Sequence, residues 1–229
     1  MPIKLIGTSH IAKESIKAIQ NEVTLNKLDI IALELDVQRK NALLSPGPRK
    51  ISFSIIKKVG VIGFLFAFIG QIIQKKLGGI VGVSPGADMK EGLIQAKKHN
   101  LKIALIDRPI KITLKKFSKS ITFKEKIRFV TDIIKGILFP RKQIEQIGIF
   151  DISSVPKQEV IDHMVAFVKI RYPSVYSTLI AQRDRYMVKK LQILQEAFPE
   201  ANILAIVGAG HINGMVKLLN ELDINFTTR

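Results

Sequence analysis

Cysteine and tryptophan are absent from this 229-residue sequence, and acidic residues are about half as numerous as basic ones. Without cysteine, the chain forms no disulfide framework, no zinc ribbon and no thiol nucleophile, so any metal must bind His, Asp or Glu. Three tyrosines and no tryptophan leave few stacking platforms for single-stranded nucleic acid. A Gly-x-x-x-x-Gly-Lys-Ser/Thr phosphate loop is also missing. These absences exclude thiol enzymes, cysteine-based metal folds and P-loop proteins.

The excess of basic residues is large, because 36 Lys and Arg stand against 19 Asp and Glu and give a formal net charge of +17. Such a charge favours nucleic acid, anionic lipid or an acidic ligand as partner. No recognised DNA- or RNA-reading module accompanies it, so nucleic acid is the least expected of the three. Hydrophobic residues make up 47% of the chain, and its length fits one domain over residues 1–229. The opening, MPIKLIGTSH, lacks the pattern of a signal peptide.

Short apolar stretches alternate with helical patterns at both ends of the chain. Strands are expected at Pro2–Ile6, Asp29–Leu35, Lys102–Asp107, Ile203–Val207 and near residues 224–227. Helices are expected at Ile11–Leu28, from an Asp36 cap through Leu44, from Asp88 to about His99, and at Lys157–Ile170, Ser174–Phe198 and Ile212–Leu219. This pattern predicts an α/β fold with a mostly parallel central sheet flanked by helices. The middle third predicts a helical insert or lid, in residues 45–85 and 110–150, with the later half of residues 109–142 helical.

One segment, Val59–Ile73, carries no charge and is bracketed by lysine pairs. Its fifteen residues fall short of the roughly 20 that a helix needs to cross a bilayer. Three interpretations stay open for it: a core helix of the insert, a contact between copies, or a segment at an anionic membrane surface.

Unusual residues follow four of the expected strands. Gly7-Thr8-Ser9-His10 follows the first, Glu34 ends the second, Asp107-Arg108 follows the third, and Gly208-Ala209-Gly210-His211 follows the fourth. In an open parallel sheet the carboxyl ends of the strands share one edge, and ligands bind there. The sequence therefore predicts that these residues converge on one site.

Two histidines and a carboxylate in that group, His10, His211 and Glu34, are the minimum set for a divalent metal with open positions. The same three residues could instead be a general base and the groups that orient it. Each histidine could also serve only to order the start of a helix.

Arg183 lies on the apolar stripe of its helix, four residues after Leu179 and four before Met187. A guanidinium that faces the core needs a carboxylate, for which Glu34 or Asp107 is the candidate, whereas a snorkelling side chain would reach the rim. The neighbouring Asp184 is expected on a solvated face.

Three further residues carry two interpretations each. Arg39 fits either a substrate carboxylate, bound through two hydrogen bonds, or the open surface. Asp88, three residues before Glu91, matches a capping box at the start of a helix and otherwise a role in the site. Asp107 is either a partner for the core-facing arginine or half of a self-paired turn with Arg108.

Taken in order, the stretches IGTSHIAKES, IALELDVQR, GVSPGADMKEGL, ALIDRPIKITL, AQRDRYM and IVGAGHINGM resemble the TraB/PrgY (pheromone shutdown) family. That family is similar to a wider clan with the Tiki metalloproteases, ChaN-like proteins and erythromycin esterases. The resemblance implies an α/β sheet with a helical insert and a site built from His10, Glu34, Arg39, Arg183 and His211, with Asp88, Asp107 and Asp184 beside them. Where many relatives have Glu-Arg-Asp, this chain has Gln182-Arg183-Asp184.

The function that the resemblance implies is metal-dependent hydrolysis of peptides. His10, Glu34 and His211 would hold Mn²⁺, Co²⁺ or Zn²⁺, Glu34 would be ligand or general base, and Arg39 and Arg183 would orient Glu34 or hold a substrate carboxylate. The competing hypothesis is a non-catalytic, membrane-associated regulator that binds or sequesters a peptide at the same site. A homo-oligomer is compatible with either. The expected location is cytoplasmic or peripheral to a membrane, and a soluble part of a longer membrane protein is the third placement.

Overall fold

The structure is a computed structural model, and it describes residues 3–8, 13–45, 60, 64, 86–138 and 158–228. Within these ranges five strands form one sheet in the order β3-β2-β4-β1-β5, and every adjacent pair is parallel. The strands are β1 (Ile3–Thr8), β2 (Ile30–Leu33), β3 (Lys102–Leu105), β4 (Ile203–Gly208) and β5 (Phe226–Thr228). The predicted parallel α/β fold is confirmed.

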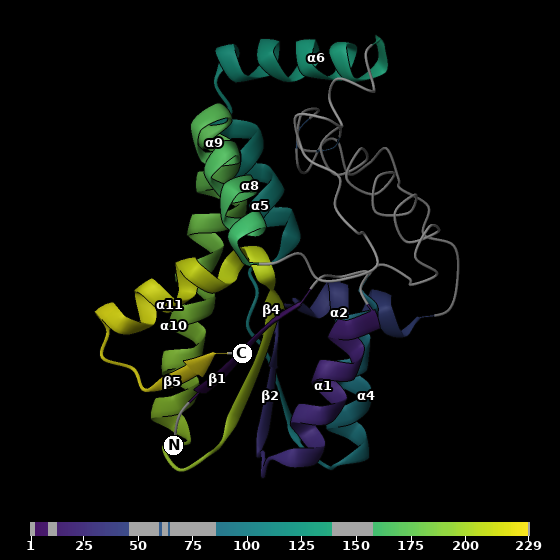
Figure 1. Ribbon diagram of the computed structural model, residues 1–229, viewed down its shortest axis with the longest axis vertical. Helices are drawn as coiled ribbons and strands as arrows, with labels where there is room; N and C mark the ends of the chain where they lie inside the picture. Colours follow the sequence, from purple (N-terminus) through teal and green to yellow (C-terminus); the bar gives the residue numbers. More distant parts are fainter. Residues whose placement is uncertain are drawn as a thin grey trace.

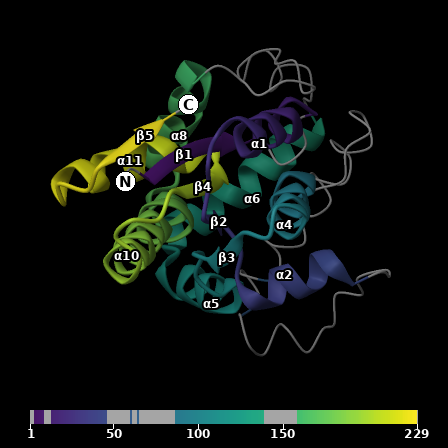
Figure 2. The ribbon, with the colours of Figure 1, turned by 90° about the horizontal axis from the view of Figure 1, so that it is seen from below.

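Helices cover both faces of the sheet and give three layers (Figures 1 and 2). On one face, α1 (Lys13–Leu25) and α4 (Ala87–Lys98) pack Ile19 and Leu93 against Ile31 and Leu33 of β2. On the other face, α10 (Gln182–Ala197) and α11 (Ile212–Glu221) bury their apolar stripes against the inward side chains of β1 and β4. These alternating apolar positions make the sheet core fully buried, as a parallel sheet requires.

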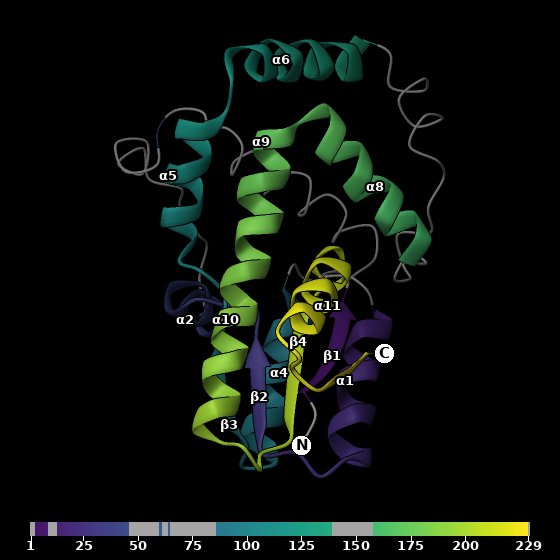
Figure 3. The same ribbon diagram turned by 90° about the vertical axis from the view of Figure 1, so that its left-hand side faces the viewer.

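A helical layer lies beyond the carboxyl ends of the strands (Figure 3). It contains α5 (Ile110–Ser120), α6 (Phe123–Leu138), α8 (Gln158–Arg171), α9 (Pro173–Val175) and the π-helix η1 (Tyr176–Ala181), which continues into α10. The predicted helical insert in the middle third is confirmed by α5 and α6. Helix already begins at Ile110, rather than in the later half of residues 109–142, because α5 has its own apolar stripe of Leu114 and Phe117.

Polar contacts fasten α6 to the helices beside it. Glu125 accepts hydrogen bonds from both the backbone and the hydroxyl of Ser174, and Asp132 forms a bidentate pair with Arg171. Hydrogen bonds from Ser174 and Thr122 lower the pKa of Glu125 below its ordinary value, although burial opposes that shift. The helical layer is therefore a connected unit rather than a set of loose helices.

Two short helices complete the described part. Helix α2 (Val37–Leu44) starts at the predicted Asp36 cap, whose carboxylate accepts from the backbone N–H groups of Gln38 and Arg39. The 3-10 turn η2 (Ala209–His211) joins β4 to α11. The segments predicted as inserts are partly outside the described residues: most of 45–85, including most of Val59–Ile73, and residues 139–150. Within the described part, no helix combines the length and the apolar character that a bilayer span needs.

Candidate functional site

Glu34 stands directly after β2 and is almost fully buried, with 2% of its side chain exposed. Its Oε2 accepts a hydrogen bond of 2.6 Å from the backbone N–H of Gly208, at the end of β4, and its Oε1 accepts one from Arg183. The strand register explains the first contact, because Leu33 pairs with Ile206, so that Glu34 follows the end of β2 while β4 continues to Gly208. A charge thus sits at the carboxyl edge of the sheet, where the sequence predicts the site.

Arg183 reaches this edge from the first turn of α10. Its Nε and Nη2 donate hydrogen bonds of 2.9 and 2.7 Å to the two oxygens of Asp107, and Nη2 also donates to Glu34. Its Nη1 donates to the backbone oxygen of Leu179 and to His211 Nε2, both near 3 Å. The structure therefore decides between the two interpretations of Arg183: it faces the core and pairs with both carboxylates.

The energetics of this guanidinium follow from its partners. Burial by itself would lower the pKa of Arg183, but the charge of Glu34 and the hydrogen bonds with Asp107 outweigh it and raise the pKa above its ordinary value. Arg183 is therefore charged at every physiological pH. The two carboxylates it binds stay buried because this cation compensates them.

His211 lies at the end of η2, with 8% of its side chain exposed. Its Nδ1 is 2.5 Å from Asp184 Oδ1, and its Nε2 is 3.6 Å from Glu34 Oε1. Because Arg183 donates to Nε2, that nitrogen accepts and Nδ1 carries the proton toward Asp184. Asp184 thus fixes both the tautomer and the orientation of the imidazole.

Asp184 is 2% exposed, so the expectation that it lies on a solvated face is wrong. The reason is that Asp184 of α10 packs against α11 at Gly214, which leaves room for its carboxylate. A Cβ on Gly214 would lie 2.1 Å from Asp184 Oδ2. Burial raises the pKa of Asp184 above its ordinary value, and the hydrogen bond with His211 opposes that shift.

Arg39 joins the same group from α2. Its Nη1 donates a 2.8 Å hydrogen bond to Asp107 Oδ2, and 31% of its side chain remains exposed. Asp107 therefore bridges two arginines, and it is not simply half of a self-paired turn, although its Oδ1 also accepts from the backbone of Arg108. We call Glu34, Arg39, Asp107, Arg183, Asp184 and His211 the edge site.

Arg108, which the sequence places beside Asp107 after the third strand, is buried. It donates to the Thr113 hydroxyl, to Gln182 Oε1 and to the backbone oxygen of Thr178. Burial lowers its pKa below the ordinary value. The π-helical turn η1 supplies two of the acceptors for these arginines, the backbone oxygen of Thr178 for Arg108 and that of Leu179 for Arg183. A π-helix carries no pattern that periodicity would reveal.

Asp88 reaches the carboxyl end of β1 from α4. Its carboxylate accepts a 2.6 Å hydrogen bond from the hydroxyl of Thr8 at the end of β1. The predicted capping box is wrong: α4 begins one residue earlier, after Gly86, whose φ of 80° suits glycine, and Asp88 is buried in the first turn. Asp88 ties α4 to the sheet edge.

His10 lies outside the described residues, so its predicted place beside Glu34 and His211 stays a prediction. Gly82-Val83-Ser84-Pro85-Gly86 has the G-x-S-x-G spacing of a nucleophile elbow, and all of it except Gly86 also lies outside the described residues.

The predicted metal can be tested against the two remaining ligands. Imidazole and carboxylate suit a divalent ion, and the contact between Asp184 and His211 is of the kind that metal-bound histidines make. However, Arg183 donates to both atoms that would face the ion, Glu34 Oε1 and His211 Nε2. A guanidinium and a metal cannot share that position, so this arrangement does not fit an ion there. Among the described residues, no group of three or more His, Asp or Glu is placed to hold a metal.

The fold and the edge site define an α/β protein that gathers charged residues at the carboxyl edge of a parallel sheet. A model of the TraB/PrgY/gumN family matches residues 2–226, and the chain belongs to this family. It is 33% identical over 226 residues to uncharacterized protein MJ1365 of Methanocaldococcus jannaschii, over 96% of this chain and 54% of that protein.

More distant relatives include the TraB domain-containing proteins of Homo sapiens and Mus musculus. They are 21% and 20% identical over 239 residues, which cover 94% of this chain and 62% of each relative. The chain thus spans between half and two thirds of the length of the curated relatives that it matches.

Proposed function

We propose that this chain is a hydrolase that acts on peptide bonds, with Glu34, Arg183 and His211 at its reactive centre. The observation that carries the proposal is one arrangement: the buried carboxylate of Glu34 lies 3.6 Å from His211 Nε2, and Asp184 holds the other nitrogen of that ring. Glu34 is the carboxylate available as a general base, and the imidazole held by Asp184 fixes Arg183 beside it. Membership of the family supports the choice of peptides as substrates.

Glu34, Arg183 and His211 have different roles in the proposed reaction. Glu34 takes a proton from water while the water oxygen bonds to the peptide carbonyl carbon. The C–N bond then breaks, and the leaving nitrogen takes the proton from Glu34. His211, held by Asp184, fixes the guanidinium of Arg183 beside Glu34. The hydrogen bonds of Arg183 use all five of its N–H groups, so it would stabilise the developing negative charge through its own positive charge.

Arg39 is the cation of the edge site most open to solvent, with 31% of its side chain exposed against 14% for Arg183. A guanidinium offers five donors in a planar fork, and the described contacts of Arg39 use one of them, toward Asp107. Arg39 is therefore the residue that would first bind a substrate carboxylate.

The metal-dependent form of the proposal keeps Mn²⁺, Co²⁺ or Zn²⁺ on His10, Glu34 and His211. It requires Arg183 to give up its contacts with Glu34 and His211 and to remain on Asp107, to which it makes two hydrogen bonds. The two forms of the proposal therefore differ in a measurable way. In the metal-dependent form, the metal and Arg183 compete for Glu34 and His211, and in the other form they do not.

The second candidate function is a regulator that binds a peptide without cleaving it. The observation in its favour is that Arg183 pairs with Asp107 and His211 pairs with Asp184, as in a network that serves only to shape a binding surface. A membrane-associated regulator would use α6, where Phe123, Ile127 and Val130 are each more than half exposed and recur at helical spacing among lysines. The same side chains could meet a second copy of the chain.

The test of the hydrolase proposal is cleavage of a mixed pool of synthetic peptides, followed by mass spectrometry of new termini. The pool is incubated with the protein alone, with added Mn²⁺ and with a chelator. New termini that appear at a constant set of bonds support a hydrolase, and loss with the chelator supports its metal-dependent form. Peptides that co-purify with the protein and stay intact would contradict hydrolysis and favour the regulator.

Association of α6 with a membrane is tested separately. Co-sedimentation with vesicles rich in anionic lipid should be weakened by salt and by Phe123→Ser/Ile127→Ser, if α6 lies at a membrane surface. A lower mass of that variant in light scattering, without vesicle binding, would indicate a contact between copies instead.

A further inference from the structure

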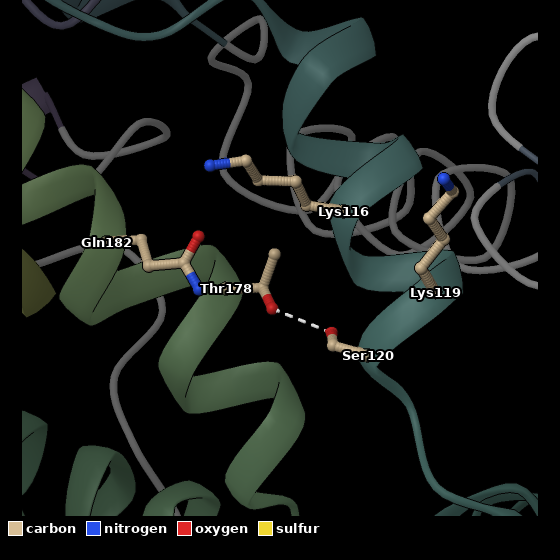
Figure 4. Close-up of a pocket in the computed structure, with 5 residues that line it drawn as sticks. All are labelled: Lys116, Lys119, Ser120, Thr178 and Gln182. Atoms are coloured by element: carbon tan, nitrogen blue, oxygen red, sulfur yellow. Dashed lines mark hydrogen bonds between the residues drawn. The ribbon is translucent and has the colours of Figure 1, made fainter.

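An open pocket of about 320 Å³ lies between α5 and the helix formed by η1 and α10 (Figure 4). Lys116, Lys119 and Ser120 line it from α5, and Thr178 and Gln182 line it from the opposite helix. The hydroxyls of Ser120 and Thr178 are 3.0 Å apart and join the two walls. The pocket therefore lies between α5 and η1, two helices that this hydrogen bond connects.

The lining has a charge of one sign. It contains two ammonium groups, two hydroxyls and one amide, and no carboxylate. Within the part of the chain that the structure describes, neither Lys116 nor Lys119 takes part in an ion pair. The hydroxyls of Ser120 and Thr178 donate to the backbone oxygen of Phe117 and to each other, and one amide N–H of Gln182 donates to Ser177. The donors left for a ligand are the two ammonium groups and the second N–H of Gln182, and these suit an oxyanion.

The pocket shares its inner wall with the edge site. Gln182 precedes Arg183 on the helix, and its Oε1 accepts from Arg108. Arg108 also holds the backbone oxygen of the fully buried Thr178, and its own neighbour Asp107 binds Arg183. A ligand in the pocket would therefore lie on the far side of the same hydrogen-bond network that positions Arg183.

We propose that this pocket is an oxyanion subsite, in which Lys116 and Lys119 bind a carboxylate or phosphate group of the molecule that the edge site acts on. The involvement of the edge site rests on the proposed hydrolase function, whereas binding of the oxyanion does not. Such a subsite would select substrates with an anionic group near the reacting bond, through contacts that Arg39 and Arg183 do not provide. It also accounts for part of the basic charge of α5.

The test measures binding directly by NMR titration of the backbone amides of Ser120, Thr178 and Gln182. The probes are inorganic phosphate, N-acetyl-alanyl-alanine with a free carboxylate, and the same dipeptide as its C-terminal amide. The charged probes should give saturable shifts, and the amide should not. In Lys116→Met/Lys119→Met the dissociation constant should rise at least about tenfold, because charge-assisted hydrogen bonds are lost.

The matched control is Lys111→Met/Lys115→Met, which removes two exposed lysines of the same helix outside the pocket. It should change the dissociation constant by less than about twofold, since screened charges at a distance contribute little. Saturation by the dipeptide acid alone assigns the subsite to a peptide carboxylate, and saturation by phosphate alone assigns it to a phosphorylated ligand. Shifts that do not saturate, or an equal loss in both double variants, would overturn the subsite in favour of diffuse attraction.

Cleavage kinetics then separate this inference from the proposed function. For a peptide that is cleaved, Lys116→Met/Lys119→Met should raise KM and leave kcat within about twofold, because the pocket binds and does not react. Oxyanion binding in a protein that cleaves nothing would retain the subsite and overturn the hydrolase. Cleavage with unchanged KM for anionic substrates would retain the hydrolase and overturn the subsite.

Discussion

Replacement of Arg183 by leucine removes the cation around which the edge site is built. Glu34 and Asp107, exposed by 2% and 1% of their side chains, each lose a charged partner. Asp107 keeps the hydrogen bond from Arg39, and Glu34 keeps that from the backbone of Gly208. Two partly compensated carboxylates would then remain inside the protein.

The expected cost can be estimated from these contacts. Removal of one partner from a buried ion pair destabilises proteins by about 3–5 kcal/mol, mostly because the other charge stays buried. Arg183 serves two carboxylates, but Asp107 retains hydrogen bonds from Arg39 and from the backbone of Arg108, and Glu34 retains that from Gly208. Arg183→Leu should therefore lower the free energy of unfolding by about 3–5 kcal/mol. The control Arg185→Leu, at the exposed next arginine of α10, should stay within about 0.5 kcal/mol.

Urea denaturation of the wild type and of both variants measures these differences. A second measurement uses the double variant Arg183→Leu/Glu34→Gln, in which the buried charge of Glu34 is also removed. The double variant should be more stable than Arg183→Leu alone, because glutamine carries no charge to desolvate. A loss below about 1 kcal/mol for Arg183→Leu, or a double variant less stable than the single, would refute the reasoning from buried charge.

Three other changes give distinct readouts. Gly214→Ala places a Cβ 2.1 Å from Asp184 Oδ2 and should lower the free energy of unfolding, measured in urea, by about 1–3 kcal/mol. In the control Gly210→Ala the Cβ comes no closer than 3.8 Å to a neighbour, so the loss should be small. Equal losses in the two variants would contradict the packing argument. Burial raises the pKa of Asp184, so the folded protein holds that proton to higher pH than the unfolded chain. The stability of the wild type relative to Asp184→Asn should therefore fall as the pH rises above the ordinary carboxyl pKa of about 4, and parallel profiles would contradict this. The metal-dependent form predicts that Mn²⁺ binds Arg183→Met at least about tenfold more tightly than the wild type in calorimetry, because the competing guanidinium is gone. Equal affinities for the two proteins would contradict competition between metal and Arg183.

The fold could be predicted because a buried parallel sheet has a strong sequence pattern. The strands at Ile30–Leu33 and Ile203–Gly208 are continuous apolar runs, and each ends within two residues of its predicted limit. The same pattern placed Glu34, Asp107 and His211 at one edge, since parallel strands have a common carboxyl end. Arg183 could be singled out because it lies on an apolar stripe, where a charge needs a partner.

The remaining residues depend on packing that no local pattern records. Asp184 follows Arg183 on the helix and is buried because Gly214 of α11 makes room for it, which is a contact between helices distant in sequence. Asp88 shows the spacing of a cap, yet the αL conformation of Gly86 starts α4 earlier. Arg108 is buried because a π-helical turn presents backbone oxygens to it, and the sequence has no signal for that turn.

We propose that Glu34 performs the chemistry of this protein. The most direct measurement is the rate of cleavage of a susceptible peptide by Glu34→Gln, compared with the wild type and with Glu196→Gln, an exposed glutamate of α10. Loss of the carboxylate base should lower kcat by at least about 10²-fold, with Glu196→Gln within about twofold of the wild type. A folded Glu34→Gln protein that cleaves the peptide at the wild-type rate would contradict the account.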